Sequence, residues 1–178
     1  NKYIAAIWDK DNIFSKLNIY TCVECGFGMA TPEPNNTHLI EFYKNVYRRK
    51  DSPFFIDFSR IDRPFYRDHR SLSQLLLVLN YVELKNNDIF VDVGPGAGYS
   101  YNELIETFGK NMLDLCAIEF SRNAGEYYKT LYNVQTFTDL NTLVKETKKK
   151  PKLLLSSHCL EHFNYQEAQE FLGLVKET

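Results

Sequence analysis

The chain has 178 residues, of which 44% are hydrophobic, and its formal net charge is −2 at pH 7. A chain of this length and composition can bury one core and carry a small appendage, and its near-zero charge argues against a nucleic-acid partner. No stretch approaches the roughly twenty apolar residues of a membrane span and no charged-then-apolar leader opens the chain, so we expect a soluble cytoplasmic protein without a membrane partner.

A C-x-x-C-G sequence near the start of the chain contains Cys22 and Cys25. Two cysteines at this spacing before a glycine form the turn that presents two thiolates to a zinc ion. The remaining cysteines, Cys116 and Cys159, lie far downstream in apolar stretches typical of reduced thiols. The knuckle therefore supplies half of a structural zinc site, with His38 either a third ligand or a surface histidine.

Aromatic residues are dense before residue 70, in a chain that contains 12 Tyr and 13 Phe. They either join an N-terminal segment to the main core or form a surface on which a substrate stacks. We predict a knuckle-like aromatic segment at 1–50, a linker at 51–70 that folds over the ligand site, and the main domain at 71–178. The aromatic residues meant here are Phe42, Tyr43, Tyr47, Phe54, Phe55, Phe58, Phe65 and Tyr66.

The main domain is predicted to begin with a helix over 71–82 that packs on a sheet. An apolar run at 89–93 then reads as a strand buried on both faces, ending near Asp92. The apolar face of the helix is predicted to contain Leu72, Leu75, Leu76, Leu79 and Val82.

Three glycines at alternate positions, Gly94, Gly96 and Gly98, follow this strand. Glycine allows a sharp turn and leaves room for a ligand against bare main chain. A helix over 100–108 comes next, with Ser100 predicted as its N-cap and Glu103 as the capping-box partner. Strand, glycine turn and helix N-terminus together indicate a nucleotide-type site.

The spacing of the glycines bears on which nucleotide is bound. The dinucleotide fingerprint G-x-G-x-x-G needs a third glycine where this chain has Tyr99. A bulky side chain there argues against a pyrophosphate pressed on the helix end. A nicotinamide-dependent oxidoreductase is therefore the disfavoured alternative.

A second strand over 113–118 ends at Glu119, about twenty residues after the loop, where a carboxylate can accept hydrogen bonds from both ribose hydroxyls. Phe120 beside it could pack on an adenine face. A third strand over 134–137 is followed by Asp139, which could be a plain helix cap.

A fourth strand over 152–156 leads into Ser157 and an H-x-L-E-H segment at 158–162, before a helix over 165–176. In a parallel sheet, ligands bind beyond the carboxyl ends of the strands, so this segment should face the reactive part of the ligand. H-x-x-E-H is also the inverted zinc-peptidase motif, but that motif needs a long helix and would leave the glycine loop unexplained.

These motifs together resemble the class I S-adenosylmethionine-dependent methyltransferases. The sequence V-D-V-G-P-G-A-G at 91–98 is similar to their motif I, and the H-x-L-E-H segment resembles one found in members that act on hydroxyls of small molecules and sugars. The N-terminal C-x-x-C-G-F, P-x-P at 32–34 and L-x-x-x-Y-x-x-x-Y at 39–47 resemble a branch of the family that begins with a two-knuckle zinc ribbon, whose first knuckle is missing here.

The resemblance implies a Rossmann-like α/β fold with a parallel sheet in which strands one to four have the order 3-2-1-4. Three further strands would then be expected, and without them the fourth strand has a bare apolar edge. We therefore expect that the chain is incomplete or that another chain covers this edge. The implied cofactor is S-adenosylmethionine, with Asp139 reading the adenine amino group. Its predicted binding residues are Asp92, Gly94, Gly96, Gly98, Tyr99, Glu119, Phe120, Asp139 and Ser157.

Methyl transfer to an alcohol requires alignment of the acceptor and removal of its proton. His158, Glu161 and His162 stand at helical spacing i, i+3 and i+4. Either histidine could take the proton while Glu161 fixes its tautomer. Alternatively, the three residues bind a divalent ion, or Glu161 and His162 only brace the turn.

The leading hypothesis is a methyltransferase that acts on a hydroxyl of a sugar, a nucleotide sugar or another small metabolite. A scaffold that binds S-adenosylmethionine without turnover is a further alternative.

Overall fold

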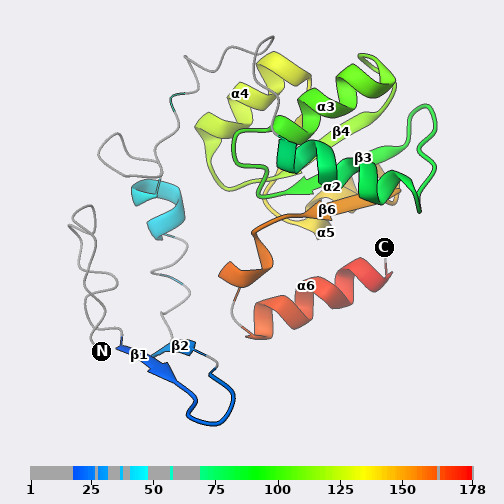
Figure 1. Cartoon of the computed structure of the whole chain (residues 1–178). Helices are drawn as coiled ribbons and strands as arrows, with labels where there is room; N and C mark the ends of the chain where they lie inside the picture. The colour runs from blue at the N-terminus through cyan, green and yellow to red at the C-terminus, as the bar shows by residue number, and fades with distance from the viewer. Residues whose placement is uncertain are drawn as a thin grey trace. The chain divides into compact units, whose positions relative to one another are not determined.

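The computed structural model describes residues 18–26, 28–31, 37, 41–47, 57, 69–163 and 165–177. The chain divides into two compact units, Asn1–Asp57 and Phe58–Thr178 (Figure 1). Most of the predicted linker lies outside the described residues, as do His38, the P-x-P sequence and the aromatic residues Phe54, Phe55, Phe58, Phe65 and Tyr66.

The first unit contains an antiparallel hairpin of β1 (Asn18–Thr21) and β2 (Gly28–Thr31). A single π-helical turn, η1 (Phe42–Val46), follows. Phe42 is buried, and the rings of Phe42, Tyr43 and Tyr47 have centroids 5.2 to 5.9 Å apart. Tyr43 packs edge-on against both other rings, and the Phe42 and Tyr47 rings are tilted to each other. These three aromatic residues therefore form a local cluster.

The second unit is built on a four-stranded parallel sheet with the order β5-β4-β3-β6. Its strands are β3 (Ile89–Val93), β4 (Asp114–Ile118), β5 (Gln135–Phe137) and β6 (Leu153–Ser156). All four lie where the sequence predicted them, and the predicted order 3-2-1-4 is confirmed.

Helices cover both faces of this sheet (Figure 1). On one face lie α2 (His69–Leu79), α3 (Tyr99–Phe108) and α4 (Arg122–Tyr132), packed on Phe90 of β3. On the other face lie α5 (Leu140–Thr147) and α6 (Tyr165–Glu177), packed on Ile89 and Val91. Alternate residues of β3 thus enter the two cores, as the two-residue period of a strand requires.

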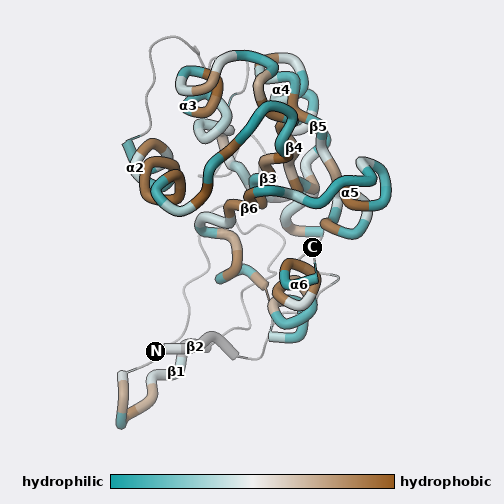
Figure 2. Tube along the Cα trace, turned by 90° about the vertical axis from the view of Figure 1, so that its right-hand side faces the viewer, coloured by the Kyte–Doolittle hydropathy of each residue, from teal (hydrophilic) through white to brown (hydrophobic). Residues whose placement is uncertain are grey.

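This three-layer arrangement is an α/β fold with a parallel sheet, and it is compatible with the predicted Rossmann-like fold. Figure 2 shows hydrophobic residues along β3, β4 and β6, between the two layers of helices. None of the helices within the described ranges is long and apolar enough to cross a membrane.

Helix α2 differs from its prediction, because it begins at His69 and ends at Leu79. Leu75 is buried, but Leu76 is 55% exposed, so its predicted place on the packed face is wrong. The buried stripe passes through Ser71 and Leu75. Leu76 lies one residue, or about 100°, around the helix from Leu75 and falls outside that stripe.

The predicted start of the helix over 100–108 is also wrong. Helix α3 begins at Tyr99, and its N-cap is Gly98 in the left-handed region, with φ 75° and no side-chain cap. Ser100 lies inside the helix, where its hydroxyl donates to the Asp92 carboxylate. Because that buried acceptor engages Ser100, no capping box forms, and the side chain of Glu103 is buried instead.

Strand β6 stands at one end of the sheet in the part of the chain that the structure describes. Its four residues are all half-buried, whereas all five residues of β3 are buried. An apolar strand edge is thus present, as predicted. That further chain or a second molecule covers it stays a prediction.

Candidate functional site

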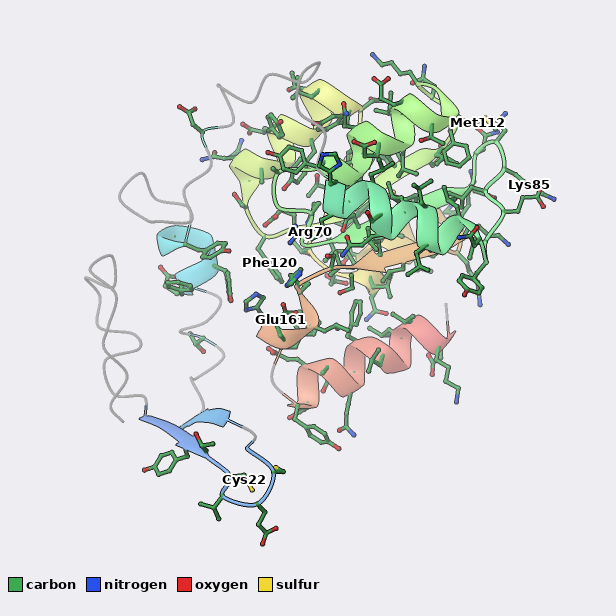
Figure 3. All side chains as sticks on the ribbon, in the orientation of Figure 1. Cys22, Arg70, Lys85, Met112, Phe120 and Glu161 are labelled. Atoms are coloured by element: carbon green, nitrogen blue, oxygen red, sulfur yellow. The ribbon has the colours of Figure 1, made fainter. Side chains whose placement is uncertain are left out.

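The four parallel strands end at one edge of the sheet, where the predicted site residues follow them. Figure 3 labels Arg70, Phe120 and Glu161 on this side, and Lys85 and Met112 at the opposite end of the sheet. A hydrogen bond of 2.8 Å from Gln74 Nε2 of α2 to Ser157 Oγ joins the first turns of α2 to the segment after β6. We call this side the carboxyl edge.

The glycine loop after β3 has the conformation that the sequence predicted. Gly94, Gly96 and Gly98 have φ values of 65°, 61° and 75°. Residues other than glycine rarely adopt this left-handed region. A Cβ atom on Gly94 would stand 3.2 Å from Cys159 Sγ. A Cβ atom on Gly96 would meet no atom of the described residues within 4 Å. An added side chain would therefore meet Cys159 at the first glycine and open space at the second.

Asp92 lies beneath this loop and is 4% exposed. Burial raises the pKa of its carboxyl to about 7, although the hydrogen bond from Ser100 acts in the opposite direction. The carboxyl is thus partly protonated near neutral pH. Its predicted contact with a cofactor stays a prediction.

Glu119 follows β4 and is half-buried. Its Oε1 accepts a hydrogen bond of 2.9 Å from Ser121 N–H, at the start of α4. Phe120 beside it is 50% exposed at the carboxyl edge (Figure 3). This placement suits the predicted contacts with a ribose and an adenine ring.

Asp139 follows β5 and caps α5. Its Oδ1 accepts from Thr142 N–H at 2.8 Å, and its Oδ2 accepts from the hydroxyls of Thr142 and Thr138. The bond from the Thr142 N–H is the largest of the effects that lower the pKa of Asp139. The capping role, left open by the sequence, is confirmed, while the contact with adenine stays a prediction.

The H-x-L-E-H segment forms one 3₁₀ turn, η2 (Leu160–His162), rather than part of a long helix. His158 Nδ1 lies 3.2 Å from Glu161 Oε1, and both side chains are more than half exposed. His158 has a φ of 53°, which is uncommon for a residue other than glycine. Of the three predicted catalytic residues, the structure pairs His158 with Glu161. The backbone N–H of His162 donates a hydrogen bond to the backbone carbonyl of Cys159.

The structure bears on metal binding through its His, Cys, Asp and Glu side chains and through the turn that contains Cys22 and Cys25. Among the described residues, no group of three or more His, Cys, Asp and Glu side chains is arranged to hold a metal ion. Cys22 and Cys25 are exposed in the hairpin turn, which a bond of 2.9 Å from Gly26 N–H to Cys22 O closes. Hydrogen bonds, above all from the Cys25 backbone, lower the pKa of Cys22. The predicted knuckle turn is therefore formed, and zinc binding stays a prediction.

Three residues at the carboxyl edge make contacts that the sequence did not predict. Gln74 bonds to Ser157, Cys159 contacts Gly94, and the hydroxyl of Tyr128 donates to Gly96 O at 2.5 Å. Burial raises the pKa of the Cys159 thiol to about 11, so it stays a neutral packing group. All three contacts join residues far apart in the chain, and no local motif signals them.

The structure thus brings the glycine loop, the Glu119 and Phe120 pair and the His158 and Glu161 pair to one edge of the sheet. Comparison of the chain with protein-family models, with curated proteins and with solved structures found no match.

Proposed function

We propose that the chain is an S-adenosylmethionine-dependent methyltransferase acting on a hydroxyl of a sugar, a nucleotide sugar or another small metabolite. The main support for this proposal is the geometry of the glycine loop and Glu119. Three left-handed glycines at alternate positions lie between strand β3 and α3, and the carboxylate of Glu119 follows the neighbouring strand β4. Such a loop offers bare main chain to a ligand, and the acid beside it suits a ribose.

The start of α3 favours S-adenosylmethionine over a dinucleotide. A dinucleotide fingerprint has its third glycine at the residue that is Tyr99 here, the first residue of α3. A bulky residue at this position argues against a pyrophosphate pressed on the helix end. A sulfonium cofactor carries no phosphate and does not need that approach.

The pair of His158 and Glu161 supports a hydroxyl acceptor. Because Nδ1 of His158 faces Glu161, Nε2 is the nitrogen that would accept the proton from the acceptor hydroxyl. When bound, S-adenosylmethionine would supply a methyl group that its sulfonium already activates, and a neutral thioether would leave. Alignment of the acceptor and removal of its proton would be the tasks left to the protein.

Calorimetric titration with S-adenosylmethionine and, separately, with NAD tests the cofactor. We expect S-adenosylmethionine to bind and NAD not to bind. Binding of NAD alone would contradict the proposal and favour an oxidoreductase.

Incubation of the protein and S-adenosylmethionine with a pool of sugars and nucleotide sugars, followed by mass spectrometry for a product with an added CH2, tests the reaction. His158→Ala should lower the rate by about 10²- to 10⁴-fold while leaving cofactor affinity unchanged. Cofactor binding without any methylated product would favour the scaffold alternative.

A further inference from the structure

We propose that Tyr128 is the positioning residue of the glycine loop, and that its hydroxyl fixes the Gly96–Ala97 peptide in the orientation that receives the cofactor. The inference rests on the proposed function for the identity of the ligand. Tyr128 lies in the middle of α4 and is 0% exposed, yet it carries a hydroxyl. A buried hydroxyl needs a partner, and the loop carbonyl of Gly96 supplies one at 2.5 Å.

The ring of Tyr128 contacts the same loop at a second point. A Cβ atom on Gly98 would stand 3.2 Å from both Cδ1 and Cε1 of this ring. One side chain therefore holds the loop at two places, by its hydroxyl at Gly96 and by its ring at Gly98. The loop is thus shaped by α4 as well as by its own sequence.

Tyr128 is itself held by a cluster of tyrosines that reaches the sheet. Its ring centroid lies 5.8 Å from those of Tyr101 and Tyr127. The hydroxyl of Tyr101 donates to Cys116 O of β4 at 2.9 Å. Burial raises the pKa of Tyr101 well above its usual value, so that donor stays protonated. The position of the loop is therefore fixed relative to β4.

The orientation of the Gly96–Ala97 peptide follows from this bond. In a trans peptide the C=O and the next N–H point in opposite directions. Since Gly96 O points at Tyr128, the N–H of Ala97 points away from α4. Within the described residues that N–H has no acceptor, and the space beside Gly96 is open. Tyr128 thus presents a main-chain donor to an acceptor group of the ligand, such as the cofactor carboxylate.

Tyr128→Phe tests the inference, because it removes the hydroxyl and keeps the ring that packs on Gly98. Tyr132→Phe is the matched control, since Tyr132 is buried in the same helix and its ring lies 5.9 Å from that of Tyr101. We expect Tyr128→Phe to raise the Kd and KM for S-adenosylmethionine about tenfold, with kcat within about twofold of the parent value. Tyr132→Phe should change neither constant by more than about twofold.

Hydrogen exchange of the ligand-free protein gives a second readout, which does not depend on the cofactor. Tyr128→Phe should speed exchange of the loop amides between Gly94 and Gly98, and Tyr132→Phe should not. Equal affinities and equal exchange in Tyr128→Phe and the parent would overturn the inference while leaving the proposed function in place. A parent protein that does not bind S-adenosylmethionine would overturn the proposed function and the cofactor role of Tyr128 together.

A second variant covers the case in which Tyr128→Phe does not fold. Gly96→Ala places a methyl group in the open space beside the outward N–H and leaves the Tyr128 bond in place. It should weaken S-adenosylmethionine binding by tenfold or more. Undiminished binding would show that the ligand does not lie against this side of the loop.

Discussion

The two halves of the proposed site are held in different ways. The glycine loop rests on fully buried side chains, Tyr101 and Tyr128, and on the buried carboxyl of Asp92. The segment after β6 has no buried residue in η2, and its two paired side chains, His158 and Glu161, are 66% and 52% exposed. This difference indicates that the glycine loop is held more firmly than the segment after β6, so under the proposed function we expect the base to become ordered further when an acceptor binds.

Substitutions should therefore separate the two halves. In the loop they should change stability and cofactor binding together, and in the exposed segment they should change turnover alone. Four substitutions, ordered by the expected change in the free energy of unfolding, test this contrast.

Asp92→Asn should have the largest effect, and only at high pH. The pKa of Asp92 is raised from 3.8 to about 7, so its stabilising contribution is complete below pH 3.8 and is lost as the pH rises through 7. At 1.36 kcal/mol per pH unit this loss reaches up to about 4 kcal/mol by pH 8. Asparagine cannot ionise, so the variant should be more stable than the parent at pH 8 and similar to it at pH 4. Denaturant titrations at both pH values measure this, and identical pH profiles would contradict the burial of Asp92.

Gly98→Ala should destabilise the protein by about 3 kcal/mol. The substitution combines a left-handed backbone, which costs roughly 1 to 2 kcal/mol, with overpacking against the rings of Tyr128 and Tyr101. Gly96→Ala is the matched control, because it has a similar φ and open space. It should lose only about 1 to 2 kcal/mol. Equal losses in urea denaturation would show that the tyrosines do not pack on the loop.

Asp139→Ala should cost about 1 kcal/mol at neutral pH, because it removes the N-cap of α5. The pKa of Asp139 is lowered, so its contribution is present above pH 3.8 and is lost as the pH falls below that value. The contributions of Asp92 and Asp139 to the free energy of unfolding should therefore depend on pH in opposite directions. Asp139→Asn retains a capping oxygen and should lose less stability than Asp139→Ala in the same denaturant titration.

His158→Asn should change stability least, by under about 0.5 kcal/mol, because its side chain is exposed and asparagine tolerates the positive φ. Methyl transfer should nevertheless fall by about 10²- to 10⁴-fold, since asparagine cannot accept the proton. Thermal unfolding and product formation are measured on the same sample. A large loss of stability with retained turnover would reverse the contrast between the two halves.

The sequence predicted the sheet well because its strands are short apolar runs bounded by glycine or polar residues, a local signal. It also offered the correct alternative for Asp139, since capping depends on residues three positions apart. It failed where a distant group decides the outcome. Ser100 bonds to Asp92 rather than capping α3, and Tyr128 supports a loop more than thirty residues before it. The exposure of Leu76 was missed because periodicity gives the width of an apolar face but not the neighbours that cover it.

The most direct test of the central claim is a crystal structure of the protein with S-adenosylmethionine. We predict that the ribose hydroxyls bond to Glu119, that the adenine lies against Phe120 and that the methionine portion lies along Gly94 to Gly98. A nucleoside bound elsewhere, or Glu119 turned away from the sugar, would contradict the account.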